Sequence, residues 1–132
     1  MPDTHPLPPA VPYADLSVRH QCYSDIIVTA AEGGIAYWAS CRDYRHQVDG
    51  VDVAACVRVR DAEDRSEPRR LITVGSIARA FARVARGEGI PQSRQAYWRR
   101  AYREAGDGSW DYDAEDADVL VQVAAYGDIV FG

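Results

Sequence analysis

Aromatic and arginine side chains between residues 37 and 60 have the clearest capacity for binding chemistry in this sequence. Nucleic-acid bases stack on aromatic rings, and the planar guanidinium group of arginine donates paired hydrogen bonds to phosphate. Aromatic residues and arginines lie close together in the segment EGGIAYWASCRDYR, and further arginines follow in the segment from Val51 to Arg60. They predict a site for a small nucleotide-like ligand. The candidate ligand-binding residues are Tyr37, Trp38, Arg42, Tyr44, Arg58 and Arg60.

Metal-binding patterns are weak in this chain. His20 lies near Cys22, and Cys41 lies near His46, but neither pair has the spacing of a zinc site and no second pair accompanies either one. We therefore expect no metal and no cofactor.

The acid-rich segment 107–118 offers two alternatives to simple binding. It lacks the turn glycine and the closing glutamate of an EF-hand calcium loop. Asp111 and Asp113 are spaced so that they could serve as an acid–base pair, but the same residues are typical of a helix start, where carboxylates are favourable. We expect a non-enzymatic protein, with a nucleotide-processing enzyme that uses Asp111 or Asp113 as the open alternative.

The elements that would position these side chains begin with strands. Alternation of residue types with a period of two starts at Ile35 and continues to Tyr44, and it recurs from Val51 to Arg60. A third short strand is predicted over Leu71 to Val74. Short connections predict that the three strands pair antiparallel as a meander. The side opposite the valines is expected to carry Trp38, Arg42, Tyr44, Arg58 and Arg60.

Helical patterns occupy the rest of the chain. They predict helices over 15–32, from a cap at Ser76, over 94–105, and from a cap at Asp113 to Gly127. The residues Ile129 to Phe131 are candidates for an edge strand. The predicted fold class is α+β, a three-stranded antiparallel sheet packed with helices in the order α-β-β-β-α-α-α. We expect a disordered proline-rich arm over 1–12 and a single α+β domain over 13–132.

Charge is distributed unevenly along the 132 residues, which carry 15 basic and 20 acidic side chains for a net charge of −5. All the basic residues are arginine. Residues 68–103 carry nine arginines against one acid (+8), whereas 104–132 carry eight acids and no base (−8). Overall acidity argues against a nucleic-acid partner, and no apolar run is long enough to span a membrane. Three cysteines without a pairing pattern and no signal peptide predict a cytoplasmic protein with free thiols.

Two stretches resemble a family of small proteins from actinobacteriophages and actinobacteria. The first contains an EGG-x-x-YW motif that begins at Glu32, and the second is the C-terminal ADVLVQVAAYGDIVFG. The similarity covers 22–87 and 110–132 and includes LITVGSIARAF, where this chain has Gly75 in place of the usual acidic residue. The resemblance implies a phage-type accessory protein, located in the host cytoplasm if it is phage-encoded.

These observations lead to one main hypothesis about function. We expect the protein to sequester a nucleotide-derived host defence signal as a homo-oligomer, without catalysis. The alternative is a protein–protein inhibitor or regulator that acts through its acidic end or its arginine-rich helices. A structural reading of the aromatic residues also stays open, in which Trp38 and Tyr44 are buried under the C-terminal helix and Arg42 and Arg58 pair with its acids.

Overall fold

The computed structural model describes residues 15–45, 54–59 and 70–131, with the backbone alone for 40–45 and 54–59. The predicted arm over 1–12 lies outside these residues. Along the chain the elements are as follows: helix α1 Val18–Thr29, the π-helical turn η2 Ala30–Gly34, strands β1 Ala39–Arg45, β2 Ala54–Val59 and β3 Arg70–Thr73, helix α2 Val74–Ala85, the short η3 Gln92–Arg94, and helices α3 Gln95–Asp107 and α4 Ala114–Tyr126.

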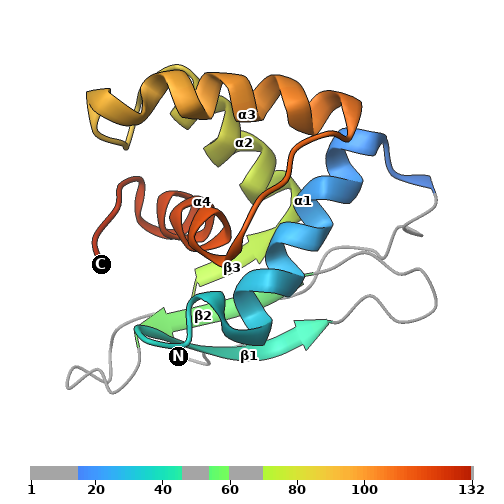
Figure 1. Ribbon diagram of the computed structural model, residues 1–132. Coiled ribbons are helices and arrows are strands. Elements are labelled where there is room, and N and C mark those ends of the chain that lie inside the picture. Colours follow the sequence, from blue (N-terminus) through green and yellow to red (C-terminus); the bar gives the residue numbers. More distant parts are fainter. Residues whose placement is uncertain (1–14, 46–53, 60–69, 132) are drawn as a thin grey trace.

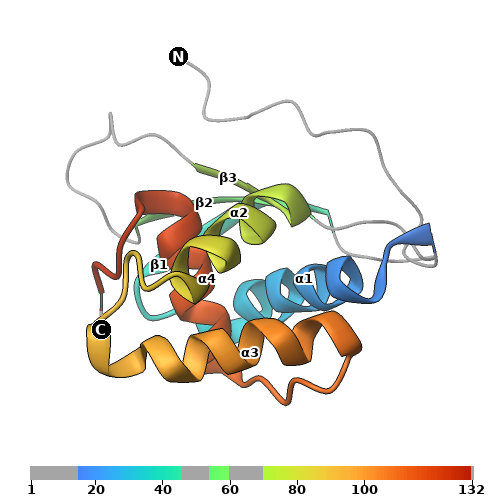
Figure 2. The same ribbon diagram turned by 90° about the horizontal axis from the view of Figure 1, so that it is seen from above.

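The helices lie on one side of the strands in two layers. The strands pair antiparallel in the order β1-β2-β3, with Cys41 opposite Val57 and Cys56 opposite Leu71. Helices α1, α2 and α4 lie next to the strands, and α3 packs on α1 and α2 away from them (Figures 1 and 2). This arrangement brings the start of α3 and the outer surface of α4 to the same side of the molecule.

The predicted fold class is corrected by this structure. The fold is mostly helical, and it is not an α+β fold organised around a sheet: among the residues whose side chains are described, only Ala39 and Arg70–Thr73 are in strands. The three short strands form a minor layer. Helices supply the core, since the ten largest fully buried side chains all lie on them except Ile35 and Ile72.

The centre of the core is a cluster of aromatic rings around Phe81 on α2. The rings of Tyr23, Trp98 and Trp110 lie with their centroids 5.6, 5.8 and 5.0 Å from the Phe81 centroid. Edge-to-face and tilted pairs of this kind stabilise a core beyond the area that they bury. Because Trp98 belongs to α3 and Trp110 to the segment between α3 and α4, the cluster fixes α3 and the start of α4 against α2.

Helix starts follow local capping chemistry. Asp113 accepts a hydrogen bond from the Asp116 amide, and Asp116 in return accepts one from the Asp113 amide, so α4 begins where the sequence predicts. Helix α2 differs from the prediction. Its cap is Thr73, with Ser76 as the reciprocal third residue, so the helix begins before the predicted cap.

The first predicted strand also begins later than expected. The chain passes from α1 into the π-helical turn and then through a second turn in which the Ile35 carbonyl accepts hydrogen bonds from the Trp38 and Ala39 amides. Gly34 allows this turn to approach α4, because a β-carbon there would lie 3.2 Å from the Ala114 carbonyl oxygen. Tyr37 and Trp38 therefore lie in a turn against α4 and not on a strand.

Candidate functional site

Helix α4 carries three buried polar side chains, and two of them, Asp118 and Gln122, share one face. Asp118 and Gln122 are 8% and 1% exposed, and their spacing of four residues places them on one face. The Gln122 side-chain nitrogen (Nε2) donates a hydrogen bond of 2.9 Å to Asp118 Oδ1. Buried polar groups need such partners, so this pair marks the face of α4 on which a polar network can form.

Trp38 is an internal part of that network. Its indole nitrogen donates a hydrogen bond of 2.7 Å to Asp118 Oδ1, and its ring is 4% exposed. The Phe131 ring stacks on it with centroids 4.7 Å apart and an angle of 11° between the planes. The predicted open stacking surface is therefore closed at Trp38, as the structural reading of this residue anticipates.

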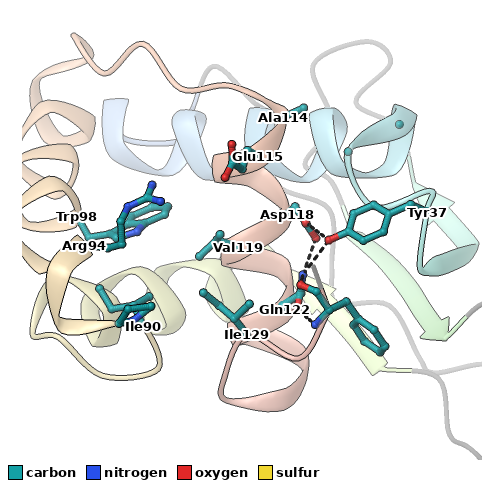
Figure 3. A pocket seen from close by; sticks show the side chains of 14 residues that line it. Tyr37, Ile90, Arg94, Trp98, Ala114, Glu115, Asp118, Val119, Gln122 and Ile129 are labelled. Atoms are coloured by element: carbon teal, nitrogen blue, oxygen red, sulfur yellow. Dashed lines mark hydrogen bonds between the residues drawn. The ribbon is translucent and has the colours of Figure 1, made fainter.

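Tyr37 points its hydroxyl inward and its ring outward. The hydroxyl donates a hydrogen bond of 2.5 Å to Asp118 Oδ2, and Gln122 Nε2 lies 3.4 Å away as a donor to it (Figure 3). The residue as a whole is 58% exposed. Burial of the hydroxyl, followed by its hydrogen bond to Asp118, raises the pKa of Tyr37 to about 12. Tyr37 is thus a rigidly held ring that is open to solvent.

The four other candidate residues are not brought into this site by any described contact. Arg42 and Tyr44 belong to β1 and Arg58 to β2, where Ser40 is paired with Arg58 and Arg42 with Cys56. Only the backbone of these three residues is described. Arg60 lies outside the described residues.

The C-terminal segment is held by Gln122 and is not the edge strand that the sequence suggests. The Gln122 side-chain oxygen accepts hydrogen bonds from the amides of Val130 and Phe131, at 2.7 and 2.8 Å. Its nitrogen donates to the Phe131 carbonyl at 3.1 Å. One side chain therefore fixes the segment that carries Phe131 onto Trp38.

A groove with a volume of about 490 Å³ lies beside this network. Tyr37 stands on one side of α4, Arg94 and Trp98 stand on the other, and Val119 and Ile129 lie between them (Figure 3). The groove is lined by Gly33, Gly34, Tyr37, Ile90, Pro91, Arg94, Trp98, Ala114, Glu115, Asp118, Val119, Gln122, Ile129 and Phe131.

Charge in the groove is mixed. Arg94 is exposed and is the one cation among its lining residues, with its guanidinium 5.4 Å from the Tyr97 ring centroid. Glu115 is exposed, whereas Asp118 is buried and each of its oxygens already accepts a hydrogen bond. This arrangement can hold a small molecule through one guanidinium, one free carboxylate, one exposed ring and an apolar floor.

Sequence reasoning found Tyr37 but missed the rest of this groove. Asp118 and Gln122 entered only through the family resemblance, although two polar residues four apart in the apolar run ADVLVQVAA were a usable signal. Arg94 carried no local signal, because its role depends on where α3 begins in space.

Asp113, which the sequence offers as a member of an acid–base pair, acts as the cap of helix α4. Within 15–45, 54–59 and 70–131, no group of three or more histidine, cysteine or acidic side chains could hold a metal ion.

Tyr97 on α3 is a second phenol whose hydroxyl is bonded to a carboxylate of α4. The Tyr97 hydroxyl donates a hydrogen bond of 2.8 Å to Asp116 Oδ2. Burial, followed by this hydrogen bond, raises the pKa of Tyr97 to about 12, while burial raises the pKa of Asp116 above its ordinary value. Both phenols keep their protons at any physiological pH.

These two phenols predict a measurable titration. Their folded-state pKa of about 12 exceeds the ordinary value of 10.0, so the stability that they contribute is present below pH 10 and is lost as the pH rises through about 12. In a titration followed by tyrosinate absorbance, Tyr37→Phe should remove a group that ionises near pH 12. Loss of a group that ionises near pH 10 would contradict the hydrogen bond between Tyr37 and Asp118. Tyr97→Phe provides the matched comparison.

Comparison with known proteins gives no match to any family model, curated protein or solved structure. In the described part of the chain, no helix combines the length and the apolar character needed to cross a membrane.

Proposed function

We propose that this protein binds a small nucleotide-like ligand in the groove between α3 and α4 and acts by holding it. The observation that carries the proposal is the position of an exposed aromatic ring, Tyr37, across the groove from an exposed guanidinium group, Arg94 (Figure 3). Rings of this kind stack with bases, and guanidinium groups bind phosphate.

The size and rigidity of the groove support this proposal. A volume of about 490 Å³ falls in the range of small-molecule sites, which are on the order of 300–1,000 Å³. The Tyr37 ring is fixed by its hydroxyl, so little ordering is needed when a ligand stacks on it. One base–aromatic contact contributes about 1–3 kcal/mol, and an arginine–phosphate contact adds to it. Together they favour capture of a ligand without any bond being broken.

The resemblance to actinobacteriophage proteins supports a biological role for such capture. We propose that the ligand is a nucleotide-derived host defence signal and that the protein removes it from circulation as a homo-oligomer. Bound ligand would be recovered unchanged. A sequestering protein of this kind needs affinity and abundance, whereas it needs no catalytic group in the groove.

Calorimetric titration of the purified protein tests the proposal. A panel of mononucleotides, cyclic oligonucleotides and ADP-ribose should contain at least one ligand that binds with one site per chain and is recovered intact by mass spectrometry. Tyr37→Ala and Arg94→Ala should each weaken binding about tenfold or more. Arg99→Ala is the matched control, because Arg99 is an exposed arginine of α3 that does not line the groove. If the folded protein bound none of the ligands in the panel, the proposal would be refuted.

A protein–protein inhibitor is the second candidate, and a separate surface favours it. Arg99, Arg100 and Arg103 are exposed on α3, and no ion pair involving them is formed by the described residues. A stripe of exposed guanidinium groups that form no ion pair with another described residue fits an acidic protein surface. Salt-sensitive co-purification of one host protein that is lost when all three arginines are replaced by alanine, but kept in Arg94→Ala, would support this candidate over the groove.

A further inference from the structure

The hydrogen-bonding groups of the groove specify which kind of nucleotide fits it. The Tyr37 hydroxyl has a single proton, and that proton is donated to Asp118 Oδ2. Its oxygen receives only the long contact of 3.4 Å from Gln122 Nε2. Tyr37 therefore has no proton left to donate to a ligand, and the part that it offers is its exposed ring.

Glu115 supplies a free hydrogen-bond acceptor among the residues that line the groove. It lies three residues before Asp118 on α4, is exposed, and has no hydrogen bond or ion pair with any described residue. Its negative charge is close enough to contribute to the raised pKa of Tyr37. An ionised carboxylate has acceptors only, so a ligand must bring hydrogen-bond donors to Glu115.

The balance of charge limits the anionic part of the ligand. Arg94 is the one cation among the lining residues, which also include the carboxylates of Glu115 and Asp118. A single phosphate group can pair with Arg94. A ligand with several negative charges would have to approach two carboxylates with one compensating cation, and unpaired charges in a partly desolvated groove are unfavourable.

We infer that the groove selects a purine nucleoside with adjacent N–H and amino donors, as in guanine, that carries no more than one negative charge. In this arrangement the base stacks on the exposed Tyr37 ring, its donor edge meets Glu115, and the single phosphate meets Arg94. Gly33 and Gly34 also line the groove, where they leave no side chain in the way of a flat ring. The inference rests on the proposed function and narrows its ligand class.

Calorimetric titration with four probes tests this selection. Cyclic GMP carries the donor pair and one negative charge, cyclic IMP lacks the amino group, cyclic AMP lacks the donor pair, and GTP carries several charges. We expect cyclic GMP to bind most tightly, and cyclic IMP to bind about tenfold more weakly because one hydrogen bond to a charged group is lost. GTP should also bind more weakly than cyclic GMP.

A variant in the recognition group supplies the internal check. Glu115→Gln should weaken the binding of cyclic GMP about tenfold and reduce the difference in affinity between cyclic GMP and cyclic IMP. The same variant should bind GTP more tightly than the original protein does. Asp111→Asn is the matched control, since Asp111 is an exposed carboxylate outside the groove, and it should change none of these values. Preference for GTP or equal binding of cyclic IMP would overturn the selection while leaving nucleotide binding intact. Absence of binding by all four probes overturns the selection, and the proposed function falls with it only if the wider panel is silent too.

Discussion

Replacement of Asp118 by alanine is expected to lower the free energy of unfolding by about 3 kcal/mol. The Asp118 carboxylate accepts hydrogen bonds from Trp38, Tyr37 and Gln122, and it is 8% exposed. Its removal leaves the buried indole nitrogen of Trp38 without a partner, and a buried donor without an acceptor costs about 1–3 kcal/mol. The loss of the other two bonds adds to this cost, while relief of a buried charge offsets part of it.

Two further variants separate the contributions. Asp118→Asn keeps the oxygen that accepts from Trp38 and Gln122, so it should cost about 1 kcal/mol. Tyr37→Phe removes one hydrogen bond from an exposed residue and should cost less than 1 kcal/mol. Urea unfolding followed by circular dichroism measures all three. If Asp118→Ala were no less stable than Asp118→Asn, the network would not hold the Gly33–Trp38 turn against α4.

The parts of the fold that depend on local chemistry were predictable from the sequence. Helix α4 begins after the carboxylate cap Asp113 and ends at Gly127, which has a φ of 81°. Both signals act on their immediate neighbours in the chain, so the sequence contains them. The buried stripe of α2, with Ile77 and Phe81, follows from helical spacing. Thr73 was missed as the α2 cap because Ser76, three residues later, carries the same type of side chain.

The small share of the fold that the strands form, and the arrangement of residues in the site, were not predictable from local patterns. Alternation of residue types from Ile35 onward resembles a strand, but the hydrogen bonds of the Ile35 carbonyl turn the chain before β1 begins at Ala39. Trp38 meets Asp118 across 80 residues of sequence, and no local pattern indicates such a contact. The exposed or buried state of an aromatic residue is decided by these distant contacts.

The oxygen and nitrogen of Gln122 connect three separate parts of the structure, so its replacement should have the second large effect. Gln122→Ala is expected to lower the free energy of unfolding by about 2–3 kcal/mol, because Phe131 and Asp118 lose their partners in a buried setting. It should also detach the segment with Ile129 and Phe131, which line the groove. Amide hydrogen exchange at Val130 and Phe131 measures the detachment directly, with fast exchange expected in the variant and protection in the original protein.

Gln122→Glu distinguishes the hydrogen-bond network from simple packing, because it keeps the shape of the side chain. An ionised glutamate would retain the acceptor for the Val130 and Phe131 amides but would lose the donor and face the Asp118 carboxylate. Burial and this like charge raise the pKa of the new carboxyl group, so the folded state holds its proton more tightly than the unfolded chain does. The stability of Gln122→Glu should therefore rise as the pH falls from 8 to about 5, where the protonated group again donates to Asp118. If the stability of Gln122→Glu had the same pH dependence as that of Gln122→Ala, the hydrogen bond donated by Gln122 would not be what holds Phe131 on Trp38. Packing of the C-terminal segment would then hold it.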